Sequence, residues 1–243
     1  MHSISSSGFD NMRATIASRI LETACTCSIP GWGADEQPIA DENGNVVIIP
    51  AGPRMATHGK VTIQGTNNLI LLGEDVLLDK CSLEIKGDNC TILIGSRSTL
   101  RGVRIAIKGQ GAYVAIGEKL GWRGGSISNA GDGNHVIIGD DGMFAGGIIL
   151  RTDDQHGIFD RATQARINPP KPIVIHEHVW LANGVRVGKG AVVGAGAVVA
   201  QLSLVTGAVE PHSLYGGMPA RKLRDNIAWT RGMAWESVPQ KFK

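Results

Sequence analysis

Cysteine is scarce in this chain and follows no recognisable pattern. The four cysteines form neither CxxC pairs nor a Cys/His zinc spacing, because Cys25 and Cys27 make a lone CxC and Cys81 and Cys90 stand apart from them. A disulfide framework and a structural zinc site are therefore not expected. A reduced, cytoplasmic protein is the default prediction for such a chain.

Long hydrophobic runs and a strong excess of charge are also missing. No stretch of about 18 apolar residues occurs, so we expect no membrane span. The N-terminus, MHSISSSGFDNMRATIASRIL, lacks the uninterrupted apolar core of a signal peptide. A net charge of +2 argues against a dedicated nucleic-acid binder.

Glycine, by contrast, is abundant and periodic, at 33 of 243 residues. Many glycines and aliphatic residues recur in separate columns with a step of 22 residues. A fixed step of this length indicates stacked, near-identical coils. The columns are Gly65, Gly87, Gly109 and Gly131; Gly73, Gly95, Gly117 and Gly139; Val61, Leu83, Ile105, Ile127 and Ile149; and Ile70, Ile92, Val114 and Val136.

A second period, of six residues, follows in the later part of the chain. In each hexad a short strand buries its apolar residue and a small residue forms the corner, so stacked coils pair as parallel sheets. The 22-residue coil is three such hexads plus a four-residue excursion, GTNN, GDNC, GQGA or GDGN. The hexad residues are Ile175, Leu181, Val187, Val193, Val199 and Val205.

These periods divide the chain into one solenoid with appendages. The regular coils stop at Arg151, and a polar loop with a histidine interrupts them, which is where we expect chemistry. Asp10 is the predicted cap of an N-terminal helix, and a second short helix is expected after the coils. The predicted segments are a partly helical N-terminal segment (1–45), long-period coils (46–150), an active-site loop (151–174), hexad coils (175–210) and a C-terminal segment (211–243).

Three segments carry a resemblance to a known family: HGIFDRATQARINPPKPIVI, HVWLANGVRVGKGAVVGAGAVV and YGGMPARKL. With the hexads, they resemble the hexapeptide-repeat acyltransferases, and most of all the O-acetyltransferases of sugars in capsular or sialic-acid-containing polysaccharides. The resemblance implies an all-β, left-handed parallel β-helix that transfers acetyl groups from acetyl-CoA to a glycan hydroxyl. It also implies a homotrimer with active sites between neighbouring subunits, and no metal.

The same resemblance assigns roles to individual residues. His156 matches the general base, and Trp180 matches a functionally important tryptophan of the polysaccharide-modifying members. The family's coenzyme A contacts fall on Asn183, Gly194, Ala195 and Arg224. The chain departs from many relatives at Ala200-Gln201, where they carry Thr-Lys, and in the hexad 205–210, which is extra relative to them. It departs again at Gly125, the nearest match to an asparagine of the small-sugar enzymes.

The residues themselves fit acyl transfer to a hydroxyl. A sugar hydroxyl needs a base, and histidine, with an ordinary pKa of about 6.5, is largely neutral in the cytoplasm. Asp153 or Asp154 is expected to orient the imidazole of His156 or stabilise its protonated form. The backbone N–H or the indole of Trp180 is the candidate oxyanion donor. Basic side chains near the end of the chain are candidates for binding the phosphates of coenzyme A: Arg221, Lys222 and Arg224.

Two other classes remain open at this point. One is a zinc enzyme of the carbonic-anhydrase type, which would use His156, His176 and His178; the other is a non-catalytic solenoid scaffold. The histidines other than His156 are otherwise expected to be ordinary surface residues, with His178 on the outer face of its hexad. Arg101 aligns with Arg123 across coils, which indicates either a solvated face or a shallow track for an anionic polymer.

Overall fold

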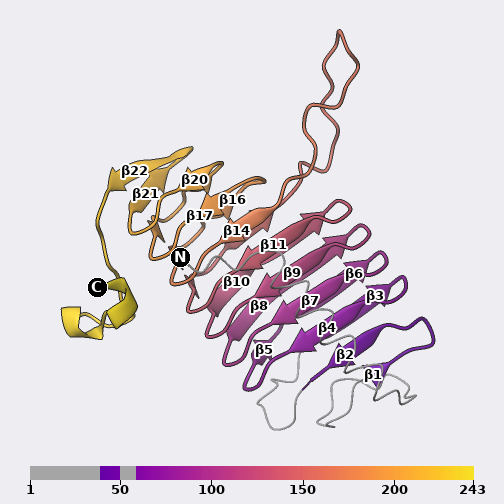
Figure 1. The fold of residues 1–243 in the computed structure, drawn as a ribbon, viewed down its shortest axis with the longest axis horizontal. Coiled ribbons are helices and arrows are strands. Elements are labelled where there is room, and N and C mark those ends of the chain that lie inside the picture. The colour runs from indigo at the N-terminus through magenta and orange to yellow at the C-terminus, as the bar shows by residue number, and fades with distance from the viewer. Residues whose placement is uncertain (1–38, 50–58) are drawn as a thin grey trace.

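The chain winds into a β-helix whose coils stack along one axis (Figure 1). The computed structural model describes residues 39–49 and 59–243. The coils have three faces, named A, B and C in the order in which the chain passes through them. Face A is a sheet of its own, whereas faces B and C form one sheet because the long strands β8 and β10 run through both.

The strands of each face follow one another along the stack. Face A contains β1 (Ile39–Ala40), β2 (Val46–Ile48), β4 (Leu69–Leu72), β7 (Thr91–Ile94), β9 (Tyr113–Ile116), β11 (His135–Ile138), β14 (Ile173–Ile175), β17 (Val192–Val193) and β20 (Ala208–Val209). Face B contains β5 (Leu77–Asp79), the first part of β8 (Thr99–Lys108) and of β10 (Gly121–Ala130), β12 (Met143–Phe144), β15 (Trp180–Leu181), β18 (Val198–Val199), β21 (Leu214–Gly217) and β22 (Ala220–Arg224). Face C contains β3 (Lys60–Gln64), β6 (Ser82–Lys86), the rest of β8 and β10, β13 (Ile148–Arg151), β16 (Arg186–Val187) and β19 (Leu204–Val205).

The predicted parallel β-solenoid is confirmed, with neighbouring coils paired in parallel. On face A, Ile70 pairs with Ile92 and Val114 pairs with Val136, as the 22-residue step requires. The six hexad residues from Ile175 to Val205 are each 2% exposed or less, because every coil turns its aliphatic residues into the same interior. Burial of these stacked aliphatic columns is the main source of stability.

One predicted column slips by a residue in the last long coil. Ile127 pairs with Leu150 rather than with Ile149, and Ser126 takes Ile149 as its partner. Before the slip, Trp122 still pairs with Phe144 at the 22-residue step, so the extra residue lies in the corner at 145–147. The slip keeps Leu150 in the core, where it is fully buried, immediately before the chain leaves the stack.

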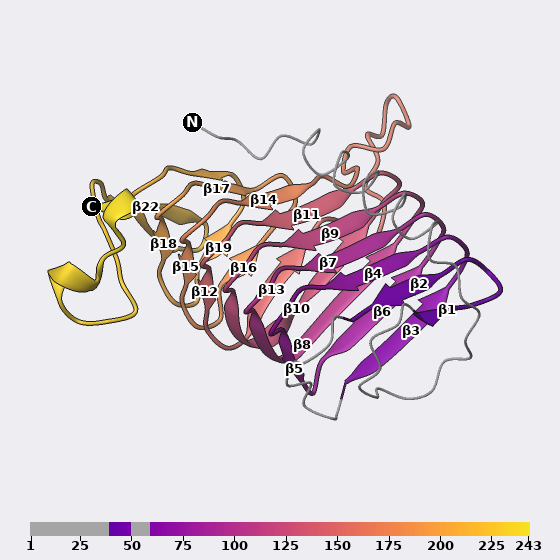
Figure 2. The same cartoon turned by 60° about the horizontal axis from the view of Figure 1, so that its bottom comes forward.

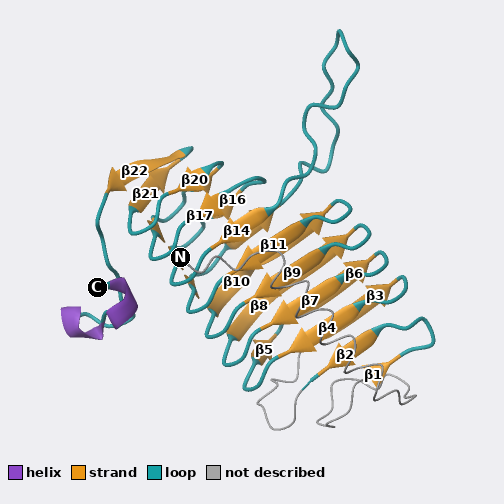
Figure 3. Cartoon of the chain, viewed as in Figure 1, coloured by secondary structure: helices purple, strands orange, loops and turns teal. Residues whose placement is uncertain are grey.

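The predicted C-terminal helix is wrong. After the hairpin of β21 and β22 the chain is irregular, and it ends in two single 3-10 turns, η1 (Trp235–Ser237) and η2 (Gln240–Phe242) (Figure 3). The physical reason is that the carbonyl of Trp229 lies 3.1 Å from Nε2 of His178, and its indole donates to the carbonyl of His178. These contacts with His178 hold the tail against the coil in an irregular conformation. The predicted N-terminal helix lies outside the described residues.

Within the described ranges, no helix has the length and apolar character needed to cross a membrane.

Candidate active site

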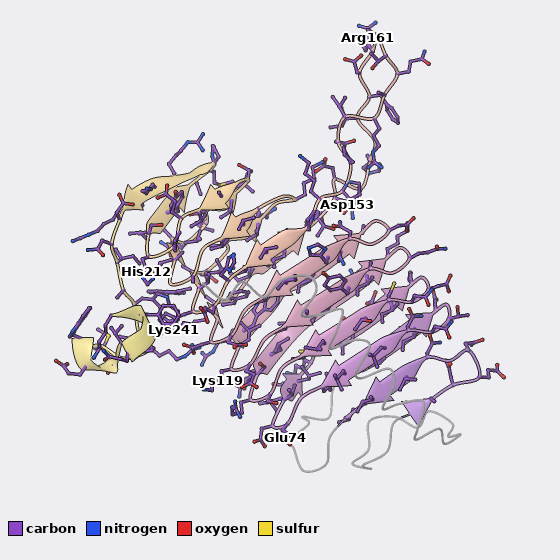
Figure 4. The ribbon with its side chains drawn as sticks, viewed as in Figure 1. Glu74, Lys119, Asp153, Arg161, His212 and Lys241 are labelled. Carbon is purple, nitrogen blue, oxygen red and sulfur yellow. The ribbon has the colours of Figure 1, made fainter. Side chains whose placement is uncertain are left out.

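The coil stack is interrupted by a long hairpin between β13 and β14, at residues 152–172, named here the arm. It leaves the corner between faces C and A and projects far from the stack, with Asp153 at its base and Arg161 at its far end (Figure 4). An antiparallel bridge joins Phe159 to Arg166. The Asp160 carboxylate closes the tip by accepting from the backbone N–H groups of residues 162 and 163 at 3.0 and 2.8 Å. The arm is thus a built hairpin that carries the predicted base, His156.

Asn168 holds the base of the arm together. This side chain is only 7% exposed, and its amide nitrogen donates to Asp154 at 2.9 Å and to the carbonyl of His156 at 2.8 Å. Its amide oxygen accepts from the backbone N–H of Ile158 at 2.7 Å and from Nε of Arg166 at 3.2 Å. Four hydrogen bonds on one buried amide therefore set the backbone on both sides of His156.

Asp154 anchors the arm to the coil. Its carboxylate forms an ion pair with Lys189, on the next coil, and accepts from Asn168. The Lys189 ammonium and then the Asn168 amide lower the pKa of Asp154 below its ordinary value. Within the described residues, Asp154 makes no hydrogen bond to the imidazole of His156. Its observed role is to hold the arm in place, whereas an orienting contact to the imidazole was expected.

Asp153 does not contact the imidazole of His156 in the described part of the chain either. Its Oδ2 accepts from the backbone N–H of Gln155 at 3.0 Å. Its Oδ1 is buried without a hydrogen-bond partner among the described residues. Burying a carboxylate oxygen without a hydrogen-bond donor costs free energy. The base of the arm therefore has a polar group whose hydrogen bond is not made within one chain.

Apolar side chains on the arm are turned outward. Ile158, Phe159 and Ile167 are 54%, 59% and 61% exposed. Three large apolar residues close together on one projecting hairpin indicate a surface that another molecule covers. His156, with an exposed imidazole, lies at the coil end of this surface.

Trp180 begins the strand β15 on face B. Its backbone N–H donates to the carbonyl of Ala197 in the sheet at 2.9 Å, so this donor is already used. The indole N–H has no hydrogen bond in the described part of the chain. Of the two predicted oxyanion donors on Trp180, the indole is the one that is free.

His156 and Trp180 are not brought together within one chain. The arm leaves the corner between faces C and A, whereas Trp180 follows the corner between faces A and B. Strand β14 of face A separates the two corners (Figure 2). The two predicted catalytic residues thus lie at opposite edges of face A.

A groove of about 460 Å³ lies on face B beside Trp180. It is lined by Trp180 and Met143, by the aligned pair Arg101 and Arg123, and by Arg231 of the C-terminal tail. We refer to it below as the face B groove. No periodic signal in the sequence pointed to Arg231, because its place in the groove depends on a contact with a coil about 90 residues earlier.

The tail that supplies Arg231 is clamped by a buried histidine. His178 is 1% exposed, stacked between Trp229 and Phe242 at centroid distances of 4.0 and 4.2 Å. Asp141 binds His178 with one carboxylate oxygen and Arg231 with the other. The expectation that His178 is an ordinary surface residue is wrong, because the tail folds back and covers this corner.

Comparisons with known proteins agree with this architecture. No protein-family model matches the chain. Among curated proteins, the polysialic acid O-acetyltransferase of Escherichia coli O1:K1 / APEC is 42% identical over 83 residues, or 34% of this chain. The match spans about a quarter of that relative, 27% of its length.

Two solved structures match over most of the chain. The polysialic acid O-acetyltransferase OatWY has a TM-score of 0.68 at 26% identity, and the match covers 79% of this chain and 90% of that one. The polySia-specific acetyltransferase NeuO has a TM-score of 0.65 at 29% identity, covering 79% and 91%. These matches support the predicted resemblance to the hexapeptide-repeat acyltransferases.

The residues predicted to contact coenzyme A border the strands of face B. Asn183 lies exposed in the corner after β15, Ala195 lies in the corner before β18, and Arg224 ends β22. Gly194 is buried beneath the next coil, and a Cβ there would lie 2.4 Å from the backbone nitrogen of Pro211. Its small size is therefore required by coil stacking, whatever else it contacts.

Gly125 explains one departure of this chain from the small-sugar members of the family. Its φ is +146°, and an added Cβ would lie 2.0 Å from the carbonyl oxygen of Ile148. No side chain fits at this corner, so an asparagine at this position is sterically excluded.

Proposed function

We propose that this protein is a sugar O-acetyltransferase that uses acetyl-CoA to modify a glycan of a capsule or other cell-surface polysaccharide, with the cytoplasmic location predicted above. The observation that carries the proposal is the interruption of the described coils by an arm bearing His156. It occurs in a chain that matches polysialic acid O-acetyltransferases over 79% of its length.

The active site in this proposal lies between two subunits of a homotrimer. His156 and Trp180 lie at opposite edges of face A in one chain, so a site that uses both needs two copies. In the trimer proposed here, the arm of one subunit would lie beside face B of the next. The exposed Ile158, Phe159 and Ile167 support this, because the neighbour would cover them.

The proposed chemistry divides between residues of the two subunits. His156 takes the proton of the sugar hydroxyl as its oxygen forms a bond to the acetyl carbonyl carbon, a role that contributes about 10²–10⁴-fold. The indole N–H of Trp180 donates to the developing oxyanion, and loss of one such donor costs about 10²–10³-fold. Acetyl-CoA supplies the acetyl group as a thioester, whose C–S bond breaks as the ester forms, and the protonated His156 returns its proton to the departing sulfur of coenzyme A. Asn183, Gly194, Ala195 and Arg224 are the residues that would hold acetyl-CoA. The arrangement requires no metal.

The first experiment is acetyl-CoA-dependent acetylation across a panel of sialic acid oligomers and neutral sugars, read by mass spectrometry. We expect acetylated product from the wild type, a loss of at least about a hundredfold in His156→Ala, and no change in His176→Ala. His176 is exposed and two residues from the buried His178, so it is a matched control for loss of a histidine. Absence of product from every acceptor, together with no binding of coenzyme A, would favour the scaffold alternative.

Complementation tests the position of the site. Coexpressed His156→Ala and Trp180→Ala chains form mixed trimers, in which some interfaces combine an intact His156 with an intact Trp180. Recovery of activity above either variant alone is expected. If the mixed trimers stay as inactive as the variants, the site is within one chain.

The zinc alternative conflicts with the observed position of His178. Nδ1 lies 2.6 Å from Asp141 and Nε2 lies 3.1 Å from the carbonyl of Trp229, so both ring nitrogens are occupied. A zinc site that used His178 would have to break the clamp on the tail. We expect EDTA to leave the acetylation rate unchanged.

A further inference from the structure

Arg101 and Arg123 are stacked like charges without a counter-ion in the described part of the chain. They are direct partners in the parallel pairing of β8 with β10, which sets their backbones about 4.8 Å apart. Like charges directly opposite each other on a sheet are destabilising. Asp79 of β5 is the direct partner of Arg101 in the parallel pairing of β5 with β8, but no ion pair forms between the two side chains within the described residues.

Two other surface arginines of the stack do have such partners. Arg97 pairs with Glu118, and Arg104 pairs with Glu84 at 2.6 Å. The Arg104 guanidinium lowers the pKa of Glu84, as a close ion pair should. Arg151 and Arg186 of face C also form no ion pair among the described residues, so Arg101 and Arg123 differ from them in lining the face B groove, not in lacking a carboxylate.

A third guanidinium closes the other side of the groove. Nη2 of Arg231 donates to Asp141 at 2.8 Å and to the carbonyls of Gly142 and Lys119 at 3.1 and 3.4 Å. These bonds, with a fourth to the Asp141 carbonyl at 3.2 Å, are all made by Nη2. Nε and Nη1 therefore keep their N–H donors unused among the described residues. The coils therefore fix this arginine of the tail in position and leave part of its guanidinium group able to bind a ligand.

The rest of the groove suits a sugar ring. Trp180 is partly exposed and Met143 lies beside it in the parallel pairing of β12 with β15. The volume of about 460 Å³ lies in the range of small-ligand sites, roughly 300–1,000 Å³. An apolar wall of indole and thioether with guanidinium groups on the rim matches a sugar that carries a carboxylate, since arginine binds carboxylates in a paired, planar geometry.

We propose that the face B groove is the acceptor subsite, in which Arg101 and Arg123 bind the carboxylates of an acidic glycan and hold one of its sugars against Trp180. The proposal rests on the proposed function, because Trp180 is the residue that ties the groove to the reaction. It assigns the selection of acidic over neutral acceptors to a pair of arginines that take no part in proton transfer.

Binding to the catalytically inactive His156→Ala protein separates recognition from catalysis. The probes are a sialic acid oligomer, the same oligomer with its carboxyl groups reduced to alcohols, and a neutral oligosaccharide, each titrated by calorimetry at two salt concentrations. We expect Arg101→Gln/Arg123→Gln to weaken binding of the sialic acid oligomer by at least about tenfold and to flatten its salt dependence. Carboxyl reduction should cost a similar factor with the arginines intact and nothing further without them.

Lys86→Gln/Lys108→Gln is the matched control. These two lysines are also aligned partners, on face C, and their replacement removes the same total charge away from the groove. Equal weakening by both double variants would mean a general charge effect and would overturn the subsite. Unchanged binding in the arginine variant would overturn it too.

The outcomes separate this proposal from the proposed function. If the enzyme acetylates glycans but the arginine variant acetylates acidic acceptors as well as the wild type does, the subsite is wrong and the function stands. If the sialic acid oligomer binds through the two arginines but no acceptor is ever acetylated, the subsite stands and the function is wrong.

Discussion

Nδ1 of His178 lies 2.6 Å from a carboxylate oxygen of Asp141, in a contact that joins two adjacent coils. The other oxygen of the same carboxylate accepts from Arg231, which lines the face B groove. Through this carboxylate, a buried histidine at a coil corner determines where an arginine of the tail is held. The tail is thus part of the groove.

Replacement of His178 should release the tail. His178→Ala removes two aromatic stacks and two hydrogen bonds at a buried site, so we expect docking of residues 225–243 to weaken by roughly 2–4 kcal/mol. Hydrogen–deuterium exchange should speed up in these residues and stay unchanged in the coils before residue 175. His176→Ala, at an exposed position, should leave the exchange of the tail as it is in the wild type. Equal exchange in both variants would mean that the clamp does not hold the tail.

Loss of the Asn168 amide should impair activity without unfolding the coils. Asn168→Ala removes four hydrogen bonds around His156, and a misplacement of about 1 Å at a reacting group can cost about 10²-fold. We expect kcat/KM for acetylation to fall by about 10–100-fold while the melting temperature of the stack changes little. Arg161→Ala at the exposed tip of the arm is the control and should be close to wild type. A large drop in melting temperature with unaltered kcat/KM would contradict this role.

Acid should loosen the arm only well below neutral pH. The pKa of Asp154 is lowered in the folded protein, chiefly by Lys189. Its contribution is therefore fully present above the unfolded pKa of about 3.9 and is lost as pH falls through the lower, folded pKa. A carboxyl carbon NMR titration should place the midpoint of Asp154 below that unfolded value. Lys189→Met should raise the midpoint, and a midpoint that does not move would show that Lys189 is not its cause.

Gly125 should tolerate no side chain, whereas Gly121 should tolerate one. An added Cβ at Gly125 meets the Ile148 carbonyl oxygen at 2.0 Å in a left-handed backbone, but nothing lies within 4 Å of a Cβ at Gly121. Such strain costs of order 1–3 kcal/mol, with the steric overlap added to it. Thermal unfolding should show a clear loss of stability in Gly125→Ala and little change in Gly121→Ala. Similar melting temperatures for both variants would mean that the corner rearranges freely.

The position of the arm and the stacking of the coils were predictable from local patterns. Repeats in a β-helix contact only their neighbours, so the same spacing of glycine and aliphatic residues returns in every coil and can be read directly. The slip from Ile149 to Leu150 was not predictable in this way. It depends on one extra residue in a corner whose length only the pairing of β10 with β13 reveals.

The partners of the site residues could not be read from the same patterns. Asp154 was expected beside the imidazole of His156, yet its partners are Lys189 and Asn168, which the next coil and the return of the arm bring to it. Arg231 and His178 gave no periodic signal at all. Each owes its environment to a tail that folds back over coils formed much earlier in the chain.

By itself, the sequence determined the coil, its period and the point at which the arm leaves it, because these follow from side chains that alternate between a shared interior and solvent along short strands. The tertiary structure alone decided that His156 and Trp180 lie at opposite edges of face A and that Arg231 joins Arg101 and Arg123 in the face B groove. The reason is that both depend on the winding of the coils and on long-range contacts of single side chains, which no local spacing encodes.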